Sequence, residues 1–354
     1  MSSYNNAPET QPSSPRQSPL KPHSPEEISG NGRQENKAPS KLSAMIEVLG
    51  FPGFILAGSA LAFFFPAPFT PLTDYITYFL MIIMFAMGLT LTIPDFKQVA
   101  KRPLAILFGV IAQFVIMPLL AIAVAKVLGL NPALAVGLLM LGSVPGGTSS
   151  NVIAYLSRGD VALSVAMTSV STLVSPIMTP FLMLVLADAH TDVDGLGMAW
   201  SLCQTVLLPV VGGLVIRVVA DSFINKILPI LPWISILGIG GVVFGAVAKN
   251  AESLANIGLI VFVAVIIHNV LGYVLGFFAG QLVGMPTAGK RTVAVEVGTQ
   301  SAGLSSGMAA KFFTPEAALP GAVAAVVHNI TGAIYVAICR KLDEGKETSK
   351  SASA

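Results

Sequence analysis

The segment from Gly142 to Pro180 constrains the fold of this chain most, because helix-breaking and polar residues there interrupt sequence of membrane-spanning character. Residues 145–147 read Pro-Gly-Gly, and residues 148–151 read Thr-Ser-Ser-Asn. Proline removes a backbone donor and glycine carries an entropic cost in a helix, so we expect the chain to unwind here. Unwound backbone at membrane depth is tolerated only where it lines protein or a water-filled cavity. The exposed carbonyls and the new helix N-terminus are the parts of a cation site and an anion site.

A second interpretation of this segment is a helix kink that packs against a neighbour through small residues. It suits an isolated Pro-Gly pair, but four consecutive polar side chains in hydrocarbon favour a functional site. We therefore expect Ser150 and Asn151 to hold an ion.

The composition is that of an integral membrane protein. Of the 354 residues, 54% are hydrophobic and 11% are charged, and the mean hydropathy is +0.77. The apolar segments are too long for a soluble core and lack the alternating polarity of a transmembrane barrel. No basic cluster indicates nucleic acid, and nothing indicates an obligatory protein partner. Cys203 and Cys339 are the only cysteines and lie in apolar or juxtamembrane sequence, so we expect neither a disulfide framework nor a zinc site.

We expect an all-α integral membrane fold with ten transmembrane helices. The expected spans lie near residues 45–65, 74–93, 103–128, 132–157, 161–186, 197–220, 231–248, 253–282, 287–311 and 316–340. Residues 1–44 are rich in Ser, Pro, Asn, Gln and charge, and they lack the pattern of a cleaved signal peptide. We therefore expect a disordered cytoplasmic tail at 1–44, a membrane domain at 45–340 and a cytoplasmic C-terminal tail at 341–354.

Lysine and arginine in the short loops predict the orientation in the cell membrane. If the N-terminus is cytoplasmic, the inside loops hold most of these residues: Lys97, Lys101, Arg102, Arg158, Arg217, Lys226, Lys290 and Arg291. The outside loops hold only Lys126, Lys249 and Lys311. Both termini are therefore expected on the cytoplasmic side.

A second interrupted span occurs at residues 295–303, which read VEVGTQSAG. The span before each break carries a polar residue in apolar surroundings, Gln113 in the third span and His268-Asn269 in the eighth. Corresponding features are five spans apart, an odd number, so the two halves would have opposite topology. Paired broken helices in inverted repeats are typical of the binding site of a secondary transporter.

Glu296 is the only carboxylate that we place deep within a span. An ionised carboxylate there is costly unless a cation neutralises it, and no lysine or arginine is expected at the same depth. The oxygen-bearing neighbours Thr299 and Gln300, together with Gln113 and Asn151, suit a hard alkali ion better than a transition metal. The alternative is a neutral glutamic acid that donates a hydrogen bond between helices.

Ser164 and Thr168 lie four residues apart in the fifth span and so share one helical face. A tight turn at 157–160 folds this face back toward the first break, where the two hydroxyls could add ligands to an ion. Hydrogen bonding to their own helix backbone explains them equally well.

Two other patterns point to chemistry less directly. The pairs His268-Asn269 and His328-Asn329 lie within spans, where a histidine more often bonds a neighbouring helix than carries protons. Residues 303–307 match the hydrolase pattern G-x-S-x-G, but that pattern needs a strand-turn-helix context that a membrane span lacks.

The stretch PGGTSSNVIAYLSRGDVALSVAMTSVSTLVSP, together with EVGTQ, resembles the bile acid:sodium symporter family, in particular its bacterial members. The resemblance covers about residues 45 to 340. It implies ten spans in two inverted five-helix repeats with crossed discontinuous helices. It also implies a core domain from 103–186 and 253–340, and a panel domain from 45–93 and 197–248.

The resemblance also implies the binding residues. One sodium site would be formed by Ser150, Asn151, Ser164, Thr168 and Glu296. The other would be formed by Gln113, Glu296, Gln300 and the backbone carbonyls of Val297 and Thr299. The substrate contacts would be Thr148, Ser149, Ser301, His328 and Asn329. Ser301 departs from the family, which usually has asparagine directly after the E-x-G-x-Q run, so the side chain here is shorter and lacks the amide.

These observations predict a sodium-coupled symporter that imports a small organic anion with two sodium ions, and that is not an enzyme. The resemblance suggests pantoate or other pantothenate precursors as substrate, with bile-acid-like sterols less favoured. Sodium ions and the lipid bilayer are the other expected partners, with no cofactor. A proton-coupled cation antiporter on a similar crossed-helix fold is the alternative, although it would want paired carboxylates. An intramembrane hydrolase is disfavoured by the missing catalytic context.

Overall fold

The computed structural model describes residues 41–188 and 191–352. The chain divides into two compact units, Met1–Ala44 and Met45–Ala354, and the fold described below is that of the second. The predicted tail falls almost wholly outside the described residues and stays a prediction. The C-terminal segment after residue 340 continues the last helix as far as Ala352.

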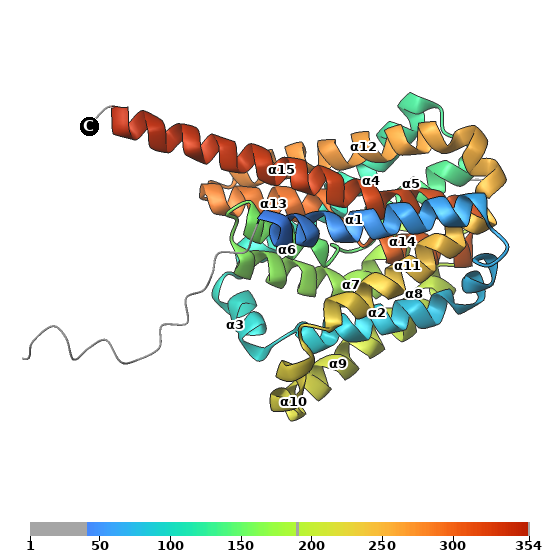
Figure 1. Ribbon diagram of the computed structural model, residues 1–354, viewed down its shortest axis with the longest axis horizontal. Helices are drawn as coiled ribbons and strands as arrows, with labels where there is room; N and C mark the ends of the chain where they lie inside the picture. The colour runs from blue at the N-terminus through green and yellow to red at the C-terminus, as the bar shows by residue number, and fades with distance from the viewer. Residues whose placement is uncertain (1–40, 189–190, 353–354) are drawn as a thin grey trace, which may run out of the picture. The chain divides into compact units, whose positions relative to one another are not determined.

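All the regular elements of the described part of the chain are helices, with no strand among them (Figure 1). The elements, in chain order, are α1 Lys41–Phe64, η1 Thr70–Tyr75, α2 Ile76–Thr90, α3 Ile93–Lys101, α4 Pro103–Leu128, α5 Pro132–Ser143, α6 Ser149–Leu156, α7 Val161–Leu186, α8 Gly195–Leu202, η2 Cys203–Leu207, α9 Leu208–Val219, α10 Asp221–Ile227, α11 Leu231–Lys249, α12 Ala251–Leu282, α13 Thr287–Gly298, α14 Ala302–Phe312, η3 Pro315–Ala318 and α15 Leu319–Ala352. The helix η2 is a π-helical turn between α8 and α9.

Local sequence explains where the helices begin and end. Pro103 stands in the first turn of α4, where its missing N–H costs nothing, and Gly129 ends that helix with a left-handed φ of 61°. The side chain of Asn131 then caps α5 by accepting a hydrogen bond from the Leu134 N–H. Asp160 caps α7 in the same way through the Leu163 N–H.

Seven helices of the described part are long and apolar enough to cross a membrane. They are Thr70–Thr90, Pro103–Leu128, Val161–Leu186, Gly195–Val219, Leu231–Lys249, Leu254–Leu282 and Pro315–Gly345. The expected fourth span is divided into α5 and α6, and the expected ninth into α13 and α14. The protein is therefore a multi-pass helical membrane protein, while the number ten stays a prediction.

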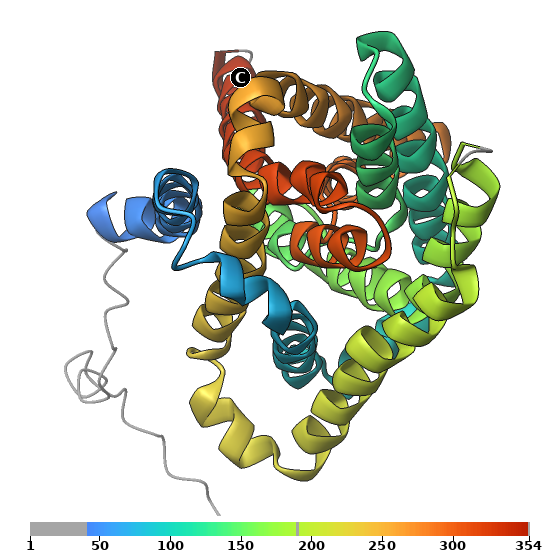
Figure 2. The same cartoon turned by 90° about the vertical axis from the view of Figure 1, so that its right-hand side faces the viewer.

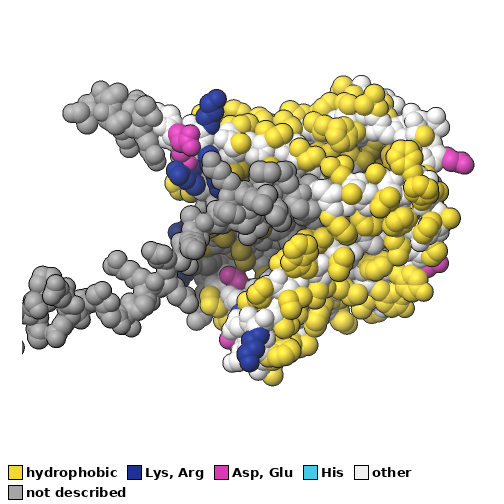
Figure 3. Space-filling model, in the orientation of Figure 1, with side chains coloured by type: hydrophobic (Ala, Val, Ile, Leu, Met, Phe, Trp, Pro, Cys, Tyr) yellow, Lys and Arg dark blue, Asp and Glu magenta, His cyan; other side chains and the backbone are white. Residues whose placement is uncertain are grey.

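The surface fits a hydrocarbon environment. Leu104, Ile177 and Leu259 are 79%, 74% and 79% exposed, which a water-soluble surface does not favour at such density. Figure 3 shows hydrophobic side chains over most of the coloured face it displays, with lysine and arginine gathered at the left-hand end beside α13 and α15 and a further group near α10. This distribution agrees with the loop charges noted in the sequence.

The helices pack in two groups (Figure 2). In one, α2 lies between α9 and α11. In the other, α12 packs along α4, α13 and α15, and α5 packs on α4. The helix α14 contacts both α2 and α11 of the first group and α5 and α15 of the second. The short helix α13 packs chiefly on α12 and also on α4, α7 and α6, and α6 packs on α13, α7 and α15, so both of these short helices lie against the second group.

Candidate functional site

The two interrupted spans meet at their breaks. Gly146 and Gln300 form an isolated antiparallel bridge. The Gly147 N–H donates to the Thr299 carbonyl at 3.0 Å, and the Ser301 N–H donates to the Pro145 carbonyl at 2.9 Å. Each break thus supplies partners for backbone groups that the other leaves without a helical partner, as buried backbone requires.

The crossing is too close to admit a side chain at Gly147. A Cβ added there would lie 2.6 Å from the backbone oxygen of Gln300 and 3.1 Å from its carbonyl carbon. Neither atom belongs to a flexible side chain, so only glycine allows the breaks to approach this closely. The Pro-Gly-Gly sequence therefore both unwinds the helix and permits the contact.

Glu296 lies at the centre of the crossing and is fully buried. The Ser150 hydroxyl lies 2.6 Å from its Oε1, and the Thr168 hydroxyl lies 2.8 Å from its Oε2. The Ser164 hydroxyl also bonds Oε1 and lies 2.8 Å from the Asn151 Oδ1. The structure thus brings together all five side chains predicted for the first sodium site.

The hydroxyls of Ser164 and Thr168 both reach Glu296, while their role as ion ligands stays a prediction. Thr168 Oγ1 bonds the Ser164 carbonyl of its own helix at 3.1 Å and also reaches Glu296. The shared helical face therefore points at the carboxylate while it keeps local hydrogen bonds.

The carboxylate of Glu296 has hydroxyl neighbours but no cationic partner among the described residues. An ionised carboxylate in such a site needs a cation or a proton. Within 41–188 and 191–352, no three His, Cys, Asp or Glu side chains converge as a metal site. The donor set of carboxylate, hydroxyl and amide oxygens fits an alkali ion rather than a transition metal.

The second predicted ion site holds unpaired polar atoms. Gln113 is buried, and both atoms of its amide lack a hydrogen bond. A Cβ added at Gly146 would lie 3.0 Å from the Glu296 Oε2 and 3.8 Å from the Gln113 Nε2, so these two groups face the same backbone. Gln300 donates from Nε2 to the Val297 carbonyl, and its Oε1 is unpaired. Buried unpaired amides of this kind are groups that a bound cation or water would satisfy.

The two carbonyls predicted as ligands already accept hydrogen bonds. Val297 accepts from Gln300, and Thr299 accepts from the Gly147 N–H. Each carbonyl oxygen has a second lone pair, so coordination of a cation remains chemically available to both.

Three of the five predicted substrate residues lie at the edge of this buried centre. Thr148, at the start of α6, is exposed and makes no capping bond with its side chain. Ser149 and Ser301, the latter at the start of α14, are half-buried. The crossing brings the starts of α6 and α14 together, since a Cβ at Gly147 would lie 3.4 Å from the Ser301 nitrogen.

The two residues of the predicted pair His328-Asn329 lie in different environments. His328 is buried, and neither of its ring nitrogens makes a hydrogen bond. Asn329 is half-buried and donates to the Ala325 carbonyl of its own helix at 2.8 Å. His268 bonds the Met117 carbonyl of α4 at 2.9 Å, which is the interhelical role expected of an intramembrane histidine.

A second set of residues holds the break after α13; sequence reasoning singled out Asn269 of this set but missed Tyr273 and Thr331. Asn269 donates to the Gly298 carbonyl at 2.6 Å and accepts from the Thr331 hydroxyl. The Tyr273 hydroxyl lies 3.0 Å from the Thr299 Oγ1. Tyr273 follows Asn269 by one helical turn, and that spacing was the available signal.

Comparison with known proteins agrees with this architecture. Residues 77–257 match the model of the Sodium Bile acid symporter family. A Bacillus subtilis protein described as the uncharacterized sodium-dependent transporter YocS is 39% identical over 300 residues, covering 85% of this chain and 94% of that protein. The probable sodium/metabolite cotransporter BASS1 of Arabidopsis thaliana chloroplasts is 35% identical, covering 82% of this chain and 73% of the relative.

A rice relative, the probable chloroplastic sodium/metabolite cotransporter BASS2, is 34% identical and covers 89% of this chain. These relatives are transporters and not enzymes, and residues 303–307 of this chain lie inside α14 rather than at a strand-helix turn. Family model, relatives and helical fold agree, and the chain belongs to the sodium bile acid symporter family.

Proposed function

We propose that this protein imports a small organic anion together with two sodium ions across the cell membrane. The observation that carries the proposal is the fully buried Glu296, surrounded by hydroxyls and without a cationic partner in the described part. Sodium ions would supply the missing positive charge.

The first sodium ion would be held by Glu296, Ser150, Asn151, Ser164 and Thr168. The hydrogen bonds that now join these side chains support the assignment, because they already gather the oxygens around one carboxylate. The second ion would be held by Gln113, Gln300, Glu296 and the carbonyls of Val297 and Thr299. The unpaired amides of Gln113 and Gln300 support it.

The anion would bind beside these ions, at Thr148 and Ser149 on one side and Ser301 on the other. Two helix starts meet there, and their N–H groups favour negative charge. His328 and Asn329 would complete this substrate site from α15. One carboxylate and one anion would then face two sodium ions, so the loaded site is electrically neutral. This balance couples the two sodium ions to the anion, since either alone leaves buried charge uncompensated.

The moving parts would be the two packed groups of helices. The core would comprise 103–186 and 253–340, and the panel 45–93 and 197–248, in ten spans and two inverted repeats. The separate packing of α2, α9 and α11 supports this division. Both termini would be cytoplasmic. Pantoate-like hydroxy acids and sterol acids are the substrate classes to test first.

Proton-coupled cation antiport is the second candidate, because a buried carboxylate can bind a proton as well as a cation. It is disfavoured because Glu296 is the one carboxylate that the described residues bury this completely.

Uptake by purified protein in proteoliposomes separates the two. Symport predicts anion uptake driven by an inward sodium gradient and unaffected when the pH gradient is collapsed. Antiport predicts sodium efflux driven by a pH gradient without added anion. A thermal-shift screen of small carboxylates, with and without sodium, would identify the anion as one that stabilises only in sodium.

A further inference from the structure

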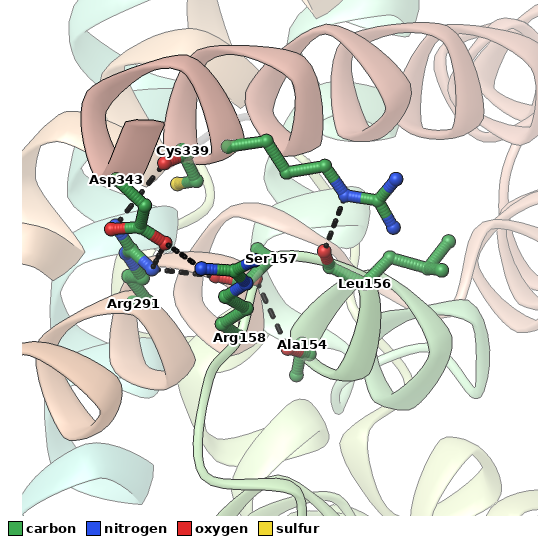
Figure 4. A network of polar contacts seen from close by, with 8 residues as sticks. Ala154, Leu156, Ser157, Arg158, Arg291, Cys339 and Asp343 are labelled. Atoms are coloured by element: carbon green, nitrogen blue, oxygen red, sulfur yellow. Dashed lines mark hydrogen bonds and ion pairs between the residues drawn. The ribbon is translucent and has the colours of Figure 1, made fainter. Parts of the chain in front are cut away.

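A buried arginine joins the far end of α6 to two other helices (Figure 4). Arg291, on α13, is 5% exposed. Its Nη1 donates to the Ser157 carbonyl at 3.0 Å and to the Asp343 Oδ2 at 2.9 Å. Its Nη2 donates to the Asp343 Oδ1 at 2.6 Å and to the Cys339 carbonyl at 3.3 Å. One guanidinium thus contacts the end of α6 and the Cys339–Asp343 turn of α15.

Other cations reinforce the same junction. Arg340, on α15, donates from Nε to the Leu156 carbonyl at 3.2 Å, and the Arg158 Nη1 lies 3.5 Å from the Asp343 Oδ2. Leu156 and Ser157 carry the last carbonyls of α6, which have no donor within the helix. Positive charge at this helix end is also favoured by the helix dipole.

The junction matters because α6 and α13 carry three of the five residues of the first proposed ion site, while α7 carries Ser164 and Thr168. Ser150 lies seven residues before Ser157, and Glu296 lies five residues after Arg291. At about 1.5 Å per residue, the junction stands roughly 8–10 Å from the site along both helices. The backbone bridge between Gly147 and Thr299 holds the other end of α6. The short helix is therefore fixed at both ends against the helix that bears the carboxylate.

We propose that Arg291, oriented by Asp343, is a positioning residue for the sodium site that contains Ser150, Asn151 and Glu296. Removal of Arg291 takes away the guanidinium that joins the Ser157 carbonyl to α13 and to Asp343 of α15, so the ligands on α6 are fixed less firmly relative to the carboxylate. Residues that orient ion ligands change affinity by about tenfold to a hundredfold when removed. The proposal rests on the proposed function, since it concerns the affinity of that same site.

The contacts made by residue 291 require arginine in particular. A planar fork can bond a carboxylate in bidentate fashion and still reach two carbonyls on different helices, which the single ammonium of lysine does not reproduce. Lysine at this position would keep the charge but lose the simultaneous contacts. A charge requirement and a positioning requirement therefore give different results for Arg291→Lys.

Binding of radioactive ²²Na⁺ to the purified full-length protein tests the inference without knowledge of the anion. We expect Arg291→Gln to weaken sodium binding by about tenfold and Arg291→Lys to restore it only in part. Asp343→Asn should weaken binding in the same direction. The double variant should bind no more weakly than Arg291→Gln alone, because the two residues act as one unit.

Arg217→Gln is the matched control. Arg217 is 8% exposed and pairs with Asp221 at 3.3 Å, but it lies on α9, which carries no proposed sodium ligand. Sodium binding should be unchanged in that variant. Thermal stability in potassium should be measured for all variants, so that sodium affinity is compared only between folded proteins.

Each outcome decides the question. Unchanged sodium affinity in folded Arg291→Gln, or equal weakening in Arg217→Gln, would overturn the positioning role. If Arg291→Gln does not fold, unchanged affinity in Asp343→Asn and Arg291→Lys overturns it instead. If the unmodified protein itself binds no ²²Na⁺, the proposed function fails, and that failure is distinct from a failure of the positioning role.

Discussion

Ser150 and Glu296 are 146 positions apart in the chain and are joined by a 2.6 Å hydrogen bond between Oγ and Oε1. Ser150 lies in the first turn of α6, just after the first break, whereas Glu296 lies in the last turns of α13, just before the second. Neither half of the chain holds this arrangement alone. The proposed ion site therefore forms only when the two interrupted spans cross, which links folding of the core to binding.

Replacing Glu296 with glutamine tests the ion site directly. The amide keeps the shape of the side chain but removes the charge that would face two sodium ions. We expect sodium-driven anion uptake to fall to the level of empty liposomes, and ²²Na⁺ binding to weaken by more than the roughly tenfold loss of a merely orienting residue.

The control for that variant is Glu316→Gln. Glu316 accepts a 2.7 Å hydrogen bond from Asn131 and belongs to neither proposed ion site. The Glu316→Gln variant should take up the anion at the rate of the unmodified protein. Near-normal sodium-driven uptake by Glu296→Gln, at equal expression, would remove Glu296 from the mechanism.

Gly147→Ala tests the crossing of the breaks. The added methyl group would lie 2.6 Å from the Gln300 oxygen, so backbone must move. Overpacking of this kind costs about 1–3 kcal/mol, and the strain falls on the residues that line both proposed ion sites. We expect a lower melting temperature and greatly reduced uptake.

Gly212→Ala is the comparison, because nothing lies within 4 Å of a Cβ added there. Alanine is a better helix former than glycine, so this variant should be at least as stable as the unmodified protein. Equal behaviour of the two variants would mean that the close approach at Gly147 has no role in transport.

The two breaks could be predicted from the sequence because their causes are local. Proline, consecutive glycines and polar runs in apolar sequence act on the residues that contain them. Ser164 and Thr168 could be placed only on one shared helical face, which left ion binding and backbone bonding equally open; the structure gathers both with Glu296.

The long-range partners could not be predicted in this way. Arg291 counts as a loop charge in the sequence, yet it is 5% exposed and bonded to Asp343. That pairing depends on where α15 lies relative to α13, and no local pattern specifies it. In the sequence, Tyr273 is an ordinary aromatic residue in an apolar span. Only the structure shows its hydroxyl 3.0 Å from the Thr299 Oγ1. The π-helical turn at Cys203–Leu207 has no local sequence cause that we identify.

Three substitutions separate the proposed ion residues from the proposed substrate residues. Gln113→Ala and Asn151→Ala should each weaken sodium binding and lower the Hill coefficient for sodium in uptake, since each removes a ligand of one site. Thr148→Val keeps the side-chain volume but removes an exposed hydroxyl at the start of α6. It should raise the KM for the anion with a smaller effect on sodium. If all three variants behave alike, the division into ion and substrate residues is wrong.

The charge moved in each cycle tests the number of sodium ions. Two sodium ions that enter with one monocarboxylate carry one net positive charge inward, worth about 2.3 kcal/mol per 100 mV of membrane potential. An inside-negative potential, imposed with potassium and valinomycin, should therefore accelerate uptake. Gln113→Ala removes a ligand of the second site only, so any remaining uptake should depend less on the potential. An uptake rate independent of the membrane potential, with a measured sodium-to-anion ratio of one, would exclude the two-ion mechanism. Glu296 would then bind a single sodium ion.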